Sequence, residues 1–170
     1  MSTENDRHFR RSSYREKVVE HLFVGELLRY LGAIRAEAVD ILKPEVDNGG
    51  YDIVVTHGAT VRHIQLKASL LNGSAVSQNI NASLGDHPSG CIVWILVDEN
   101  LNFEGFLWFG SEPGEPLPDL SERKQAKHTR GNAQGIKPVR TNTKVVPKSA
   151  FERLGSFAEL AERLFGAKPL

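Results

Sequence analysis

The chain has 170 residues, of which 40% are hydrophobic and 25% are charged, and its 21 basic residues balance 21 acidic ones. This composition is ordinary for a soluble globular protein, and the length favours one domain spanning residues 1–170. A net charge of zero argues against a protein that coats nucleic acid indiscriminately. No apolar run approaches the roughly 18 residues of a membrane helix, so we expect no membrane partner.

The cysteine content and the first residues bear on the cellular compartment. Cys91 is the only cysteine, so no disulfide within the chain is possible, and its place before an apolar run favours a packing role. Residues 1–13 are polar and lack the hydrophobic core of a secretory signal, and we expect them to be flexible. These features predict a cytoplasmic protein.

The first predicted element is a helix over residues 14–31, where apolar residues recur at helical spacing and Gly32 follows as a natural stop. Glu26 borders the apolar stripe of this helix. A carboxylate in that position is costly unless it is paired or faces a cleft. Glu26 is therefore a candidate site residue, and an ion pair with Arg29 or Arg15 is the alternative.

A strand is predicted over residues 36–42, and a loop rich in chain breakers follows at residues 43–50. A β-hairpin comes next. Its first strand is the β-branched run 51–56, its turn contains His57 and Gly58, and its second strand is predicted over residues 61–68.

The hairpin brings three chemically useful side chains together. Gln65 and Lys67 point to the same face of the second strand, because side chains alternate along a strand, and Asp52 begins the first strand. The pattern predicts a carboxylate, an amide and an ammonium on one side of a small sheet. Such a trio suits a site that handles a divalent metal and a phosphodiester. A structural ion pair between Asp52 and Lys67 is the less favoured alternative.

The next segments alternate in character. Residues 74–84 are predicted to form a helix, and residues 91–97 form a continuous apolar run, which is typical of a strand covered on both faces. An antiparallel strand is predicted over residues 103–109. Residues 150–165 are predicted to form one amphipathic helix or two short ones.

The segment 111–147 is predicted to be a long irregular insertion, because Pro113, Pro116 and Pro118 interrupt any regular element. Its second half is basic, and a basic patch is the electrostatic footprint of a phosphate-backbone binder. A solvated loop is the alternative. The residues that we expect to contact nucleic acid are Arg123, Lys124, Lys127, Arg130, Lys137, Arg140 and Lys144.

One motif resembles a known family. Asp52, followed by Gln65-Leu66-Lys67 and preceded by the helical Glu26, resembles the signature of the PD-(D/E)xK nuclease superfamily, in the Gln-x-Lys form of Mrr-like enzymes. The proline that gives the motif its name is absent before Asp52. The resemblance implies an α/β, restriction-endonuclease-like fold with an αβββαβ core and a mixed central sheet flanked by helices.

The resemblance also implies a mechanism that uses Mg²⁺ or Mn²⁺. Asp52, the Gln65 amide oxygen and the Leu66 carbonyl would bind the cation, and Glu26 would act through water or a second metal. Lys67 would orient or deprotonate the attacking water. The catalytic residues implied are Glu26, Asp52, Gln65 and Lys67.

Two functions remain open at this point. The first is a metal-dependent nuclease that hydrolyses phosphodiester bonds in DNA, in defence, repair or junction processing, with RNA still open as a substrate. The second is a catalytically inactive module of the same fold that binds nucleic acid or a partner protein. In either case the chain could act as a homodimer or as a subunit of a larger complex.

Overall fold

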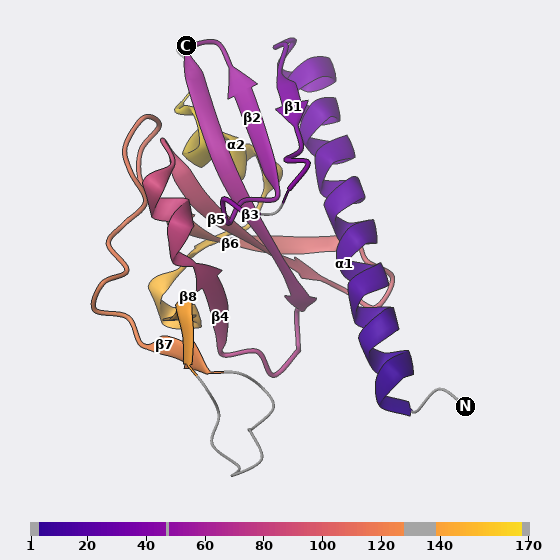
Figure 1. Cartoon of the computed structure of the whole chain (residues 1–170). Helices are drawn as coiled ribbons and strands as arrows, with labels where there is room; N and C mark the ends of the chain where they lie inside the picture. Colours follow the sequence, from indigo (N-terminus) through magenta and orange to yellow (C-terminus); the bar gives the residue numbers. More distant parts are fainter. Residues whose placement is uncertain (1–3, 47, 128–138, 168–170) are drawn as a thin grey trace.

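The computed structural model describes residues 4–46, 48–127 and 139–167. Figure 1 shows the arrangement of the chain. The helical elements are α1 (Glu4–Leu28), η1 (Arg29–Ile34), η2 (Ala82–Asp86), η3 (Lys148–Ala150) and α2 (Phe157–Phe165). The strands are β1 (Asp40–Leu42), β2 (Ile53–His57), β3 (Thr60–Leu70), β4 (Ser77–Asn81), β5 (Gly90–Val97), β6 (Phe103–Gly110), β7 (Gln125–Lys127), β8 (Val139–Pro147) and β9 (Glu152–Leu154).

The centre of the molecule is a six-stranded mixed sheet in the order β1-β2-β3-β5-β6-β9. β3 and β5 are parallel, whereas β1 with β2, β2 with β3, β5 with β6, and β6 with β9 are antiparallel. The prediction of an α/β chain with a mixed central sheet is confirmed. The predicted hairpin is present as β2 and β3, and the two strands predicted next are β5 and β6.

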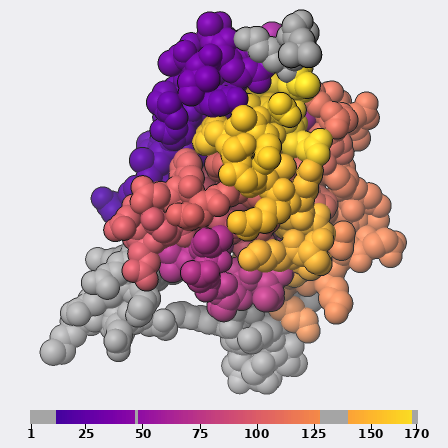
Figure 2. Space-filling view, turned by 180° about the vertical axis from the view of Figure 1, so that it is seen from behind, coloured from indigo at the N-terminus to yellow at the C-terminus, as the bar shows by residue number. Residues whose placement is uncertain are grey.

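Two different layers cover this sheet. Residues of α1 and α2 pack together on one face, where Phe157 of α2 lies 5.7 Å from Phe23 of α1 between ring centroids. Seen from behind, the C-terminal segment lies beside α1 over the middle of the molecule (Figure 2). The other face is covered by a three-stranded sheet in the order β4-β8-β7. Among the described residues, both α-helices lie on the first of these faces, and the short helix η2 contributes Leu84 to the second.

β5 lies between the two layers, and all of its residues are buried. Cys91, Val93 and Ile95 face the helices, and Trp94 and Leu96 face the small sheet. Burial on both faces explains the continuous apolar run in its sequence. It also agrees with the packing role expected for Cys91, because burial raises the pKa of this thiol to about 12.

The predicted helix over residues 74–84 is wrong, because the segment forms β4 and the short η2 instead. Ile80 is the buried residue of β4, and β4 pairs with β8 along its length. The Asn81 side chain accepts a hydrogen bond from Ser83 N, which competes with helical bonding at this point. The helix was predicted from apolar residues at i, i+4 spacing. In this segment the same spacing occurs in an edge strand followed by a turn.

Other boundaries also differ from the predictions. α1 begins at Glu4, within the segment expected to be flexible, and helical structure continues through η1 to Ile34. The described residues of the segment 111–147 include the strands β7 and β8, where an irregular insertion was expected. Residues 150–165 divide into β9 and α2, since a capping box between Ser156 and Glu159 starts the helix there.

A buried arginine joins β3 to the end of α2. The Arg62 side chain is fully buried, and its Nε donates to Leu164 O at 2.7 Å. Its Nη2 donates to Arg163 O at 2.8 Å and to Ser111 O at 2.9 Å. The last carbonyls of a helix have no partner within the helix, so Arg62 supplies the donors that they need.

We predict that Arg62→Met lowers the free energy of unfolding by about 2–4 kcal/mol, because buried carbonyls lose charged donors. Urea denaturation followed by circular dichroism measures the change. Arg153→Met is the matched control, since Arg153 is exposed on β9 and should leave the stability close to that of the wild type. Equal stabilities for the two variants would contradict this role of Arg62.

Candidate active site

The site begins where β2 stops covering β3. β3 extends to Leu70, but β2 pairs with it only from Thr60 to Ile64. Asp52 lies just before β2 and continues the contact: its backbone N–H donates to Ile64 O at 2.8 Å, and its Oδ2 accepts from Leu66 N at 2.6 Å. The carboxylate thus takes the place of the next backbone acceptor, and the remaining outer edge of β3 is left without a neighbouring strand in the described part of the chain.

A polar cavity of about 820 Å³ occupies this edge. The middle of α1 passes beside β3, and β4 lies across from it (Figure 1). The residues that line the cavity come from α1, β3, β4, β5, β8 and the start of the hairpin: Ser13, Glu16, Lys17, Val19, Glu20, Asp52, Gln65, Leu66, Lys67, Ala68, Ser77, Gln78, Asn79, Asn81, Ile95, Arg140 and Thr143.

Three of the four predicted catalytic residues, Asp52, Gln65 and Lys67, line this cavity together. Ile53 pairs with Ile64, so the continued register places Asp52 opposite Gln65, and Lys67 follows on the same face of β3. Gln65 is buried, and its Oε1 has no hydrogen-bond partner. A buried polar atom without a protein partner is uncommon in folded proteins, and water, a ligand or an ion can complete its hydrogen bonding or coordination.

The loop before Asp52 is fixed by close packing against β4. Gly50 has a φ of +75°, and a Cβ at this position would lie 2.8 Å from Asn81 Cβ. Only glycine fits this conformation and this distance without strain. The Asn81 side chain also accepts a hydrogen bond from Asn142 Nδ2, which ties β4 to β8 at the same corner.

Glu26 lies elsewhere. Its carboxylate pairs with Arg29, with 2.7 Å between Oε2 and Nη2, and 40% of its side chain is exposed. It lines a separate hollow of about 490 Å³ with residues such as Phe103 and Phe157. The expected approach of Glu26 to Asp52 is therefore absent, and the alternative pairing with Arg29 is the one that the structure contains.

Glu16 and Glu20 are the glutamates of α1 that line the cavity, and Glu20 is buried, with only 7% of it exposed. Glu20 precedes Glu26 by six positions, which corresponds to roughly 120° around the helix and about 9 Å along it. The sequence contained a signal for this face: Ser13, Glu16, Lys17 and Glu20 recur at the spacing of one helical side.

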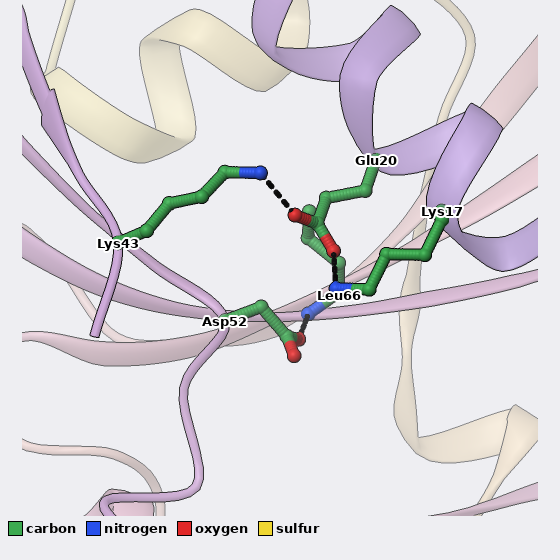
Figure 3. A network of polar contacts seen from close by, with 5 residues as sticks. All are labelled: Lys17, Glu20, Lys43, Asp52 and Leu66. Carbon is green, nitrogen blue, oxygen red and sulfur yellow. Dashed lines mark hydrogen bonds and ion pairs between the residues drawn. The ribbon is translucent and has the colours of Figure 1, made fainter. Parts of the chain in front are cut away.

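Two lysines surround Glu20 (Figure 3). Lys17 Nζ lies 2.8 Å from Oε2, and Lys43 Nζ, from the loop after β1, contacts Oε1. Burial tends to raise the pKa of Glu20, but hydrogen bonds and charge from Lys17 and Lys43 outweigh it and hold the pKa below the usual 4.5. Glu20 is therefore ionised at neutral pH and joins α1 to the loop that leads to Asp52.

The predicted nucleic-acid contacts separate into groups. Arg140 lines the cavity, whereas Lys144 donates to the carbonyls of Ser121 and Arg123 at 3.1 and 3.2 Å and closes the loop before β7. Lys124 and Lys127 are exposed near β7, away from the cavity lining. Arg130 and Lys137 lie outside the described residues.

Asn81 and Thr143 line the cavity but were not predicted, because residues 74–84 were assigned to a helix and 111–147 to an irregular loop.

The atoms that could bind a metal ion at the open edge of β3 are oxygen atoms. They are the Asp52 carboxylate, the unpartnered Gln65 Oε1 and the Leu66 carbonyl, which points to the same edge as the Leu66 N–H. Hard cations such as Mg²⁺ prefer this chemistry and need only one or two carboxylates from the protein. The residues therefore fit Mg²⁺ or Mn²⁺. Among the described residues, no group of three or more His, Cys, Asp or Glu side chains is placed to hold a metal ion.

Comparisons of the chain with protein-family models, with curated proteins and with solved structures found no match. Within the described ranges, no helix combines the length and the apolar character needed to cross a membrane.

We predict that Glu20→Gln destabilises the protein by about 1 kcal/mol at pH 7, because both lysines lose a charged partner. The folded-state pKa of Glu20 is lowered, so its contribution is complete above the unfolded pKa and is lost as the pH falls through the folded value. Urea unfolding of both proteins at pH 7 and at about pH 3 should therefore show a difference that shrinks in acid. A difference in stability between the wild type and Glu20→Gln that is the same at both pH values would contradict this assignment. The control is Glu26→Gln, which alters the exposed ion pair of Glu26 with Arg29.

Proposed function

We propose that this protein is a metal-dependent nuclease that hydrolyses phosphodiester bonds in DNA. The observation that carries the proposal is the buried Gln65 Oε1, which has no partner and lies in one cavity with Asp52 and Lys67. A carboxylate, a second oxygen donor and an ammonium around one polar cavity are the groups that phosphodiester hydrolysis requires.

The element order supports a restriction-endonuclease-like core. α1 is followed by the antiparallel β1, β2 and β3, and then by β5, which is parallel to β3. The connection from β3 to β5 departs from the αβββαβ pattern, since β4 and η2 replace the helix expected there. The helix-to-strand exchange lies on the cavity side, where it supplies the amide-bearing wall.

Each residue has a defined part in this proposal. A bound Mg²⁺ or Mn²⁺ would supply charge stabilisation and an activated water. Asp52, Gln65 and Leu66 would hold the cation through their oxygens, and Glu20, rather than Glu26, is the helical acid beside them. Lys67 would hold the attacking water or the phosphate oxygen by its ammonium. Arg140, at the mouth of the cavity, would contact the phosphate backbone.

A second candidate function is a module of the same fold that binds nucleic acid or a partner protein without cleavage. One observation favours it: both carboxylate oxygens of Glu20 already contact lysines, so this acid is occupied by cations of the protein itself. A homodimer or a larger complex is compatible with either function.

We predict that the purified protein cleaves DNA in Mg²⁺ or Mn²⁺, and that Asp52→Asn and Lys67→Met each lower the rate by about 100-fold or more, since each removes charge stabilisation in the transition state. Plasmid DNA, single-stranded DNA and RNA are incubated with the protein and separated by electrophoresis. Glu26→Gln is the matched control and should retain the wild-type rate, because Glu26 lies in the other hollow.

The same assay separates the two functions. Binding of DNA without cleavage, unaffected by Asp52→Asn and Lys67→Met, would support the non-catalytic module and contradict the nuclease. Loss of cleavage in Glu26→Gln with full activity in Glu20→Gln would contradict the assignment of the helical acid.

A further inference from the structure

Glu20 is surrounded by cations of the protein itself. Lys17 contacts one carboxylate oxygen and Lys43 contacts the other. The Glu20 side chain is 9% exposed, whereas the Lys17 side chain is 71% exposed. The carboxylate is therefore fixed and desolvated, while the Lys17 ammonium reaches it from the surface on a flexible stem.

The described residues around the cavity give it no excess of negative charge. Its lining contains the acids Glu16, Glu20 and Asp52 and the cations Lys17, Lys67 and Arg140, and Lys43 adds a further positive charge at Glu20. A divalent cation that entered alone would meet no surplus of negative charge, and it would have to displace an ammonium to reach Glu20. A phosphodiester brings the missing negative charge, and Mg²⁺ sites commonly use substrate phosphate as a ligand.

We propose that Lys17 and Lys43 keep the divalent cation away from Glu20 until a phosphodiester strand enters, so that cation and nucleic acid bind cooperatively. Lys17 is the residue that moves: its ammonium leaves Glu20 for a phosphate oxygen, and Glu20 then faces the cation directly or through water. Lys43 remains as the positioning residue that joins the loop before Asp52 to α1. This inference rests on the proposed function, because it concerns the same cavity.

The test is Mn²⁺ binding measured by isothermal titration calorimetry, with and without an oligonucleotide whose phosphorothioate linkages resist cleavage. The wild type should bind Mn²⁺ weakly alone and about tenfold or more tightly with the oligonucleotide, a factor in the range reported for groups that support metal ligands. Linkage requires that Mn²⁺ raise the affinity for the oligonucleotide by the same factor. Lys17→Met should bind Mn²⁺ more tightly than the wild type without oligonucleotide, and the oligonucleotide should add less.

Arg29→Met is the matched control. It removes the cation of an i, i+3 ion pair on the same helix, as Lys17→Met does, but its partner Glu26 lies outside the cavity. Its Mn²⁺ affinity should equal that of the wild type. Lys17→Arg retains the positive charge and should restore weak binding without oligonucleotide, which separates the charge effect from a change in the fold.

The outcomes distinguish this inference from the proposed function. Equal Mn²⁺ affinities for the wild type and Lys17→Met, or tight Mn²⁺ binding by the wild type alone, overturn the inference even if DNA is cleaved. No Mn²⁺ binding by any of these proteins, with or without oligonucleotide, overturns both. Cooperative binding together with no cleavage of any nucleic acid supports the inference and leaves a binding module in place of the nuclease.

Discussion

The hydrogen bond from Leu66 N to the Asp52 carboxylate is the interaction on which the site depends. It lies where β2 ends and β3 continues, so a side chain replaces the backbone of a missing neighbouring strand. If β2 began a few residues earlier, its backbone would cover this edge of β3 and the cavity would close. The bond instead leaves the edge open and fixes a carboxylate beside Gln65.

The two layers of the core explain why this edge forms a cavity and not an exposed rim. The helical layer places the middle of α1 on one side, and the small sheet places β4 on the other. α1 contributes charged groups, with Glu20 bound by Lys17 and Lys43, while β4 contributes neutral amides. In the proposed function, the charged wall would face the phosphates of a nucleic acid and the amide wall would face its bases.

The balance of charge in the cavity links the structure to the proposed chemistry. An unpartnered amide oxygen marks a place for a ligand, but the lysines at Glu20 reduce the attraction for a cation that arrives by itself. Under our proposal, such a site would respond to the joint presence of cation and phosphate. This property would restrict hydrolysis to the moment when a nucleic acid strand is bound.

The sequence alone determined the parts that depend on local periodicity. The alternation of side chains along β3 brought Gln65 and Lys67 to one face, and the pairing of β3 with β2 brought Asp52 beside them. The apolar run of β5 identified a strand that is buried on both faces. Tertiary structure decided the rest. β4 is a strand because β8, far along the chain, pairs with it, and a local pattern of apolar residues contains no information about that partner. Glu20 rather than Glu26 faces the cavity because the rotation of α1 about its axis is set by how Phe23 and Leu27 pack on the sheet, which spacing within the helix does not specify.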